Sequence, residues 1–329
     1  MTLRSRVLLL FASACAALAP AVALAHGTSA PAPSFTSLLT RWEFDPLFII
    51  LIGISSWLYI SGVRRVKANH PNSPFPRRRI AFFFGGIGTL ILALISPPAT
   101  YDTTLFSVHM WQHILLTMIA APLLVLGTPI TLALRAAPVR VRKEVLLPIL
   151  HSRGMRILTF PVLSWIIFAV VMWGSHFSPL YEDSLENAWI HRLEHFFYIT
   201  AALMFWWQAI GADPTPWRMP HPVRLLYVFL QMPQNSFLAV SIYSADHVLY
   251  PHYESLVRTW GPSPLADQQA AGVSMWIGGD MMFLIACAFV IAGWVKHEDR
   301  EAKRQDRALE RERADKARAA EAARTAPAP

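Results

Sequence analysis

Two pairs of histidines at helical spacing are the residues of this sequence best suited to chemistry. His109 and His113 lie in SVHMWQHILL, and His191 and His195 lie in WIHRLEHFF. Residues four positions apart share one face of an α-helix, about one turn from each other, so each pair can direct two imidazoles at one point. Imidazole is a ligand for copper, zinc and iron. The spacing therefore predicts that these four side chains form one metal site or two.

Several other side chains could complete such a site. Glu194 lies inside the second pair, and Met110 directly follows His109. The remaining candidates are His247 in ADHVLYPHY, Asp280 in MWIGGDMM and His26 near the N-terminus. His26 would offer copper both its ring and its α-amine if a signal peptide were cleaved before it. Asp280 could equally well form hydrogen bonds between helices.

The two cysteines leave the metal site to other ligands. Cys15 lies close to the N-terminus and Cys287 in a long apolar run, so the chain has no disulfide framework and no CxxC motif. Histidine, methionine and carboxylate groups must therefore supply the ligands. Thioethers favour Cu(I) and imidazole accepts both copper states, so copper is the expected metal and zinc the less favoured one.

Helices that cross a membrane are expected to position these residues. Hydrophobic residues make up 54% of the chain and charged residues 15%. The apolar runs are about twenty residues long, as a helix needs to cross a bilayer. We predict an all-α, polytopic transmembrane bundle within a lipid bilayer. Its seven spans are expected at 45–63, 80–98, 106–128, 157–175, 191–210, 224–244 and 270–295.

The N-terminus has the features of a secretory signal peptide. Arg4 and Arg6 precede an apolar stretch over 7–18, and Ala23-Leu24-Ala25 fits a cleavage site. An uncleaved first span is the alternative. The predicted organisation is a signal peptide (1–25), an outer N-terminal segment (26–44), a seven-helix transmembrane domain (45–295) and a charged cytoplasmic tail (296–329).

The distribution of Lys and Arg predicts the orientation in the membrane. Segments 64–79 and 129–156 are rich in basic residues, whereas 99–105 and 176–190 contain none. Basic segments stay in the cytoplasm, so the mature N-terminus is expected outside a bacterial inner membrane and the C-terminus inside. Because the basic residues serve topology, the net charge of +8 does not indicate a nucleic-acid partner. Both histidine pairs then lie at the outer side, where ionisable groups at membrane depth indicate function.

Four segments together resemble one known family. They are HMWQHILLTMIAAPLLVLGTP (109–129), HRLEHFFYITAALMFWWQAIGADP (191–214), LLYVFLQMPQNSFLAVSIYSADHVLYPHYE (225–254) and DQQAAGVSMWIGGDM (267–281). The chain is similar to the multi-span CtaG family of cytochrome c oxidase assembly factors, associated with caa(3)-type oxidases, over most of 40–295. The resemblance implies a membrane protein, not an enzyme, that helps to mature the copper centre of an oxidase. Oxidase subunits and copper donor proteins are the implied partners, and a homo-oligomer is compatible with the sequence.

Two other functions fit parts of the sequence. His191-x-x-Glu194-His195 matches the H-x-x-E-H order of an inverted zinc peptidase motif, in which two histidines bind zinc and the glutamate is the general base. Alternatively, one histidine from each pair could hold a haem iron from opposite faces in an electron carrier. The leading hypothesis is copper binding at the outer membrane face, with hand-over to an oxidase subunit.

Overall fold

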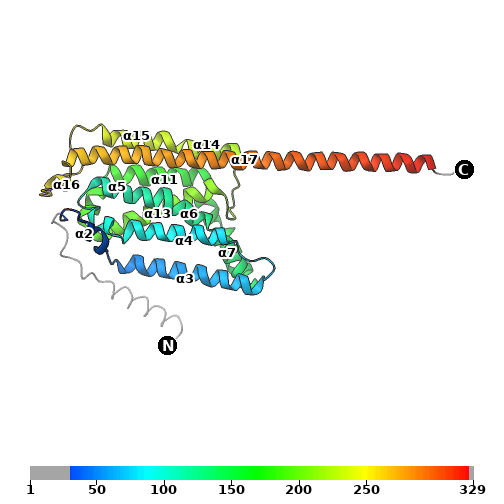
Figure 1. Cartoon of the computed structure of the whole chain (residues 1–329), viewed down its shortest axis with the longest axis horizontal. Helices are drawn as coiled ribbons and strands as arrows, with labels where there is room; N and C mark the ends of the chain where they lie inside the picture. The colour runs from blue at the N-terminus through cyan, green and yellow to red at the C-terminus, as the bar shows by residue number, and fades with distance from the viewer. Residues whose placement is uncertain (1–29, 326–329) are drawn as a thin grey trace, which may run out of the picture.

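Helices lying side by side form the body of the molecule, and a long C-terminal helix projects from one end (Figure 1). The computed structural model describes residues 30–325, within which no strand occurs. The predicted signal peptide and His26 lie outside this range. The helices are α2 (Phe35–Thr40), α3 (Pro46–Asn69), α4 (Arg77–Leu94), η1 (Pro97–Tyr101), α5 (Phe106–Ile114), η2 (Leu115–Ala120), α6 (Ala121–Leu126), α7 (Pro129–Ala136), α8 (Val139–Val141), η3 (Arg142–Leu146), α9 (Leu147–Leu150), α10 (Arg153–Leu158), α11 (Pro161–His176), α12 (Pro179–Glu186), α13 (Ala188–Ile210), α14 (His221–Phe229), α15 (Gln231–Tyr243), α16 (Pro251–Ser255) and α17 (Pro264–Thr325).

An all-α bundle with several membrane-spanning helices is confirmed, but the number seven is not. Within 30–325, five helical stretches are long and apolar enough to cross a membrane. The pair α11 and α12, bent by 67°, would be a sixth if it forms one span. Helix α13 has 23 residues but carries His191, Arg192 and Glu194 near its beginning, which lower its mean hydropathy. Seven spans therefore remain a prediction, although each of the seven predicted ranges overlaps an observed helix.

Close backbone approach joins the helices of the core. A Cβ atom added to Gly272 of α17 would lie 2.9 Å from the backbone nitrogen of Tyr243 and 3.0 Å from the carbonyl oxygen of Ala239, both in α15. Small residues permit this approach between helices in a membrane. The resulting core contains buried side chains from α5, α11, α13, α15 and α17, among them Phe106, Phe168 and Phe205.

One helix changes its winding directly after a predicted ligand. Helix α5 ends at Ile114, and η2, which follows His113 by two residues, is π-helical. The indole Nε1 of Trp206 in α13 donates a hydrogen bond of 2.7 Å to the carbonyl oxygen of Thr117 within η2. π-Helical turns are frequent at functional sites, and here the widened turn is tied to the helix that carries the second histidine pair.

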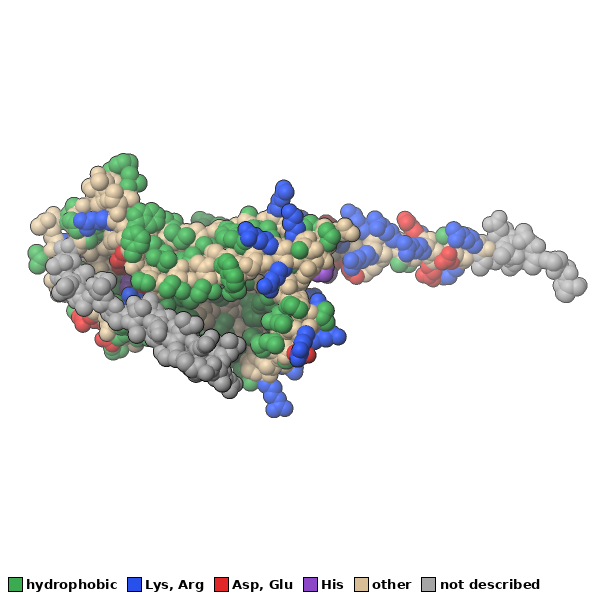
Figure 2. Space-filling model, turned by 90° about the horizontal axis from the view of Figure 1, so that it is seen from below, with side chains coloured by type: hydrophobic (Ala, Val, Ile, Leu, Met, Phe, Trp, Pro, Cys, Tyr) green, Lys and Arg blue, Asp and Glu red, His purple; other side chains and the backbone are tan. Residues whose placement is uncertain are grey.

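Charged residues are unevenly distributed over the bundle. Most of the Lys and Arg side chains on the visible face gather where α17 leaves the bundle and along its extension (Figure 2). Helix α5, which carries the first histidine pair, lies toward the other end of the bundle (Figure 1). Residues 296–325 of the predicted tail are helical, since α17 continues without a break to Thr325.

Candidate metal centre

A buried carboxylate from a distant part of the chain fixes the beginning of α5. Asp267 of α17 is 2% exposed and accepts hydrogen bonds from the backbone nitrogen of Phe106 at 2.6 Å and from Ser107 Oγ at 2.5 Å. A carboxylate at this position satisfies amide groups that lack a partner within the helix. The cap fixes the turn that precedes His109 and, one turn further, His113.

The beginning of α13 is anchored in a similar way. Asn187 Oδ1 accepts a hydrogen bond of 2.9 Å from the backbone nitrogen of Trp189. Arg192 Nε then donates to Asp45 Oδ2 at 2.6 Å, with both side chains largely buried. Asp45 also caps α3 through the backbone nitrogen of Leu47 at 2.9 Å. The residues beside Arg192 therefore have a fixed place relative to the first long helix.

The structure brings the two histidine pairs into one cluster. The ring centroids lie 4.3 Å apart for His109 and His113, and 4.4 Å apart for His191 and His195. Across the two helices, the distance is 5.3 Å between His109 and His191 and 5.8 Å between His113 and His195. The sequence did not decide between one site and two. In the structure, the four imidazoles form a single cluster.

Glu194 supplies a carboxylate to the histidines of the other helix. Its Oε2 lies 3.8 Å from His109 Nε2, and its Oε1 lies 3.8 Å from His113 Nε2. The three residues are buried, and one ligand atom from each lies within 4.8 Å of the others. A buried carboxylate is costly unless a positive charge accompanies it, and a metal ion among these atoms would supply that charge.

The hydrogen bonds of the cluster favour a ligand at the same place. Among the described residues, neither ring nitrogen of His113 has a hydrogen-bond partner, although both are buried. Such an unpartnered group costs about 1–3 kcal/mol, so most buried polar atoms are paired. A metal ion bound by His113 would use a lone pair that otherwise has no partner.

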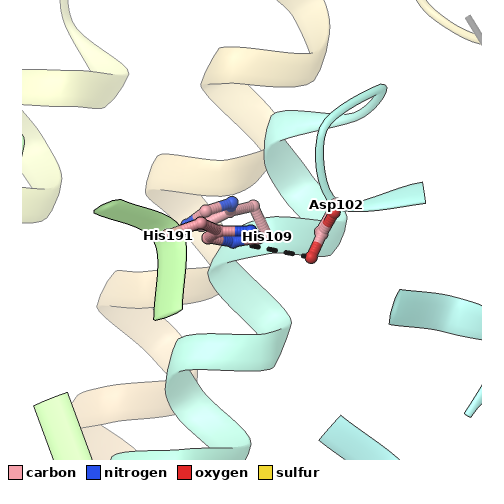
Figure 3. Close-up of side chains that lie close together, drawn as sticks. All are labelled: Asp102, His109 and His191. Carbon is pink, nitrogen blue, oxygen red and sulfur yellow. Dashed lines mark ion pairs between the residues drawn. The ribbon is translucent and has the colours of Figure 1, made fainter. Parts of the chain in front are cut away.

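A second group of potential ligands shares His109 with the first. Asp102, His109 and His191 also offer ligand atoms within 4.8 Å of one another. Figure 3 shows the rings of His109 and His191 stacked beside Asp102, with His191 Nε2 3.7 Å from Asp102 Oδ2. The side chain of His191 is 16% exposed, which makes this group the less enclosed of the two. Burial raises the pKa of Asp102 above its usual value.

His195 lies in the cluster but bonds to a different residue. Gln112 Nε2 donates a hydrogen bond of 2.9 Å to the carbonyl oxygen of Ala93, which leaves Gln112 Oε1 as an acceptor. His195 Nε2 lies 3.0 Å from that oxygen and must therefore donate to it. His195 Nε2 therefore carries a proton and has no lone pair to offer a metal in this arrangement.

The remaining candidates lie elsewhere. Met110 is buried, with its sulfur 3.4 Å from His176 Nε2. His247 is 72% exposed at its side chain and bonds to Asp246 Oδ1 at 2.8 Å. Asp280 accepts hydrogen bonds from Asn235 Nδ2 at 3.0 Å and from Ser236 Oγ at 2.5 Å, which is the interhelical alternative expected for it.

Sequence reasoning did not select Asp102, Gln112, His176 or Asp267 as site residues. Asp102 had one usable signal, because it is the acidic residue of the loop before the first histidine pair. Asp267 had none, since it lies 160 positions from Ser107 in the sequence. Only the packing of α17 against α5 brings Asp267 and Ser107 together.

Two features of the arrangement bear on the peptidase and haem hypotheses. In the inverted peptidase motif both histidines bind the metal, whereas here His195 Nε2 bonds to Gln112 and Glu194 faces the histidines of α5. Between the two helices, the rings of His113 and His195 stand at 85°, whereas those of His109 and His191 stack at 24° and present faces to each other. Axial haem ligands instead direct their nitrogens at the iron.

Comparisons with known proteins identify one matching family. The sequence model of a family described as cytochrome c oxidase caa3 assembly factor matches residues 57–297. An uncharacterized protein of Mycobacterium bovis is 28% identical over 295 residues, covering 86% of this chain and 44% of that protein. An uncharacterized protein of Mycobacterium leprae is 30% identical over 285 residues, covering 84% and 42%. The chain thus spans less than half the length of these relatives, and no solved structure matches it.

Proposed function

The chain belongs to the cytochrome c oxidase caa3 assembly factors, and on that premise we propose that it binds copper through His109, His113 and Glu194. It would hold this copper as cargo and give it to an oxidase subunit while the copper centre is formed. Two imidazoles and a carboxylate can bind either copper or zinc. We choose copper as the cargo because the oxidase that this family assembles contains a copper centre.

The proposal places the centre at the outer face of a bacterial inner membrane. Basic segments 64–79 and 129–156 would lie in the cytoplasm, and the histidine cluster at the opposite side of the bilayer. This topology uses seven spans, including α13, after a cleaved signal peptide. A copper donor on the outer side could then reach the centre without crossing the membrane.

The two overlapping ligand groups support a path for the ion. His191 and Asp102 form the less enclosed group, and His113 and Glu194 belong to the buried one. His109 belongs to both groups. Copper could therefore enter beside His191 and move inward by exchanging ligands around His109. Release to a partner would follow the same path in reverse, with no catalytic step.

One observation carries the proposal: the buried carboxylate of Glu194 faces two imidazoles from another helix at 3.8 Å each. The experiment is to purify the full chain in detergent and measure the copper bound per chain. Replacing His109 and His113 together with Ala removes two of the three ligands, so bound copper should fall at least roughly tenfold. His247→Ala is the matched control, because this histidine is 72% exposed.

The cellular measurement uses the same variants. Cells with the His109 and His113 double variant should lose cytochrome c oxidase activity, and cells with His247→Ala should keep it. Unchanged copper content together with full oxidase activity in the double variant would overturn the proposal. Zinc bound in place of copper would overturn the choice of metal.

A further inference from the structure

A small cavity lined by methionine side chains adjoins the histidine cluster. Its volume is about 10 Å³, which is about the space of one small atom. The lining includes the side chains of Met110, His113, Met118, Met172, His176 and Met275. All of these side chains are buried. His113 belongs both to this lining and to the group formed with His109 and Glu194.

The hydrogen bonds of His176 leave a lone pair turned toward a sulfur atom. His176 Nδ1 lies 2.7 Å from the carbonyl oxygen of Met172, and because a carbonyl can only accept, Nδ1 carries the proton. A neutral imidazole then has its lone pair at Nε2. That nitrogen lies 3.4 Å from the sulfur of Met110. The nitrogen lone pair and the sulfur atom, both potential metal ligands, thus face each other with no proton between them.

The neutral state of His176 follows from its surroundings. Among the described residues no carboxylate forms an ion pair with it, and Nδ1 has Ser175 Oγ and Tyr198 OH, both uncharged, at 3.2 Å. A buried imidazolium without an anion would be costly. Two carboxylates adjoin other lining residues: Asn235 Nδ2 donates to Asp280 Oδ1 at 3.0 Å, and Glu194 Oε1 lies 3.8 Å from His113 Nε2.

The chemical type of these ligands determines which metal ions they prefer. A thioether and a neutral imidazole are soft or borderline donors, and thioethers in particular select Cu(I) over divalent ions. Met172 and Met275 line the same cavity and offer two further sulfur atoms. A single monovalent ion also suits a site in which every lining side chain is uncharged.

We propose that this cavity is a second copper site, specific for Cu(I), in which Met110 Sδ and His176 Nε2 are the ligands. Copper would reach it past His113, so the site rests on the proposed function of the histidine cluster. Cu(I) is bound and released as such, and no electron transfer is involved. The chain would then hold copper in two neighbouring environments, one of nitrogen and oxygen and one that includes sulfur.

X-ray absorption at the copper edge tests this directly on the full chain. The protein is loaded with Cu(I) without oxygen, in detergent, and sulfur neighbours of copper are measured. Wild type should show sulfur, and Met110→Leu should lose it and bind Cu(I) roughly tenfold more weakly at this site. Leu replaces Met with little change in volume, so the fold should be retained. Met281→Leu is the matched control, because Met281 of α17 is 53% exposed.

The outcomes separate the two proposals. Copper with only nitrogen and oxygen neighbours in wild type overturns the methionine site and leaves the histidine site standing. Sulfur that persists unchanged in Met110→Leu also overturns it. Sulfur that is lost in Met110→Leu supports the methionine site, and nitrogen neighbours that do not change when His109 and His113 are both replaced with Ala count against the histidine site. The wild-type spectrum decides the main point even if a variant fails to fold.

Discussion

Asp267 is predicted to hold the metal centre in place from outside it. Its carboxylate accepts from the backbone nitrogen of Phe106 at 2.6 Å and from Ser107 Oγ at 2.5 Å, and it is 2% exposed. Asp267→Ala leaves the buried backbone nitrogen of Phe106 and the half-buried hydroxyl of Ser107 without this acceptor. Each such donor costs about 1–3 kcal/mol, so we expect the free energy of unfolding to fall by about 2–6 kcal/mol. Asp267→Asn keeps an oxygen acceptor and should lose much less.

A second cap of the same kind provides the matched control. Asp213 accepts from the backbone nitrogen of Thr131 at 2.8 Å, from Thr131 Oγ1 at 2.6 Å and from the backbone nitrogen of Ile130 at 3.1 Å, all in α7. None of these residues belongs to either ligand group. Asp213→Ala should therefore reduce stability to a similar extent without changing copper affinity.

The assay combines thermal unfolding in detergent with copper competition against a chelator. Asp267→Ala should lower both the melting temperature and the copper affinity, Asp213→Ala only the melting temperature, and Asp267→Asn should recover most of both. Equal loss of copper affinity in the Asp267 and Asp213 variants would mean that global destabilisation is the cause. The positioning role of Asp267 would then be refuted.

Two further perturbations test how the helices are held together. Gly279→Ala should destabilise the bundle, because the added Cβ would lie 2.6 Å from Asn235 Nδ2, which bonds to Asp280. The melting temperature measures this loss, and an unchanged melting temperature would refute the contact. Arg192→Ala should cost about 1.5–3 kcal/mol, since it removes a largely buried charged hydrogen bond to Asp45. The control Arg140→Ala breaks a pair with Glu144 that is 84% and 60% exposed and should cost under about 0.5 kcal/mol; equal losses in the two variants would contradict the difference in burial.

The sequence predicts the local part of the site well. Spacing of four residues fixes which side chains share a helix face, so the contact of His109 with His113 and of His191 with His195 follows from helix geometry alone. Glu194 is also a predicted candidate because it adjoins His195. Helical periodicity and apolar run length likewise place helices at all seven expected spans.

The tertiary part could not be predicted because it depends on which helices pack together. The partner of His195 is Gln112, and the cap of α5 is Asp267, neither of which has a local signal. His176 has no histidine four positions away, so its place beside Met110 emerges only from the tertiary contact of the end of α11 with α5. Asp280 could serve as ligand or as helix contact by sequence, and its neighbours Asn235 and Ser236 give it the second role.

The most direct test of the central claim is pulsed electron paramagnetic resonance of the chain loaded with Cu(II). This spectrum reports imidazole nitrogens of histidines bound to copper. We predict a clear histidine signal in wild type and in His247→Ala, and its loss when His109 and His113 are both replaced with Ala. A wild-type spectrum without bound imidazole, or an unchanged spectrum in the double variant, would contradict copper binding by His109, His113 and Glu194.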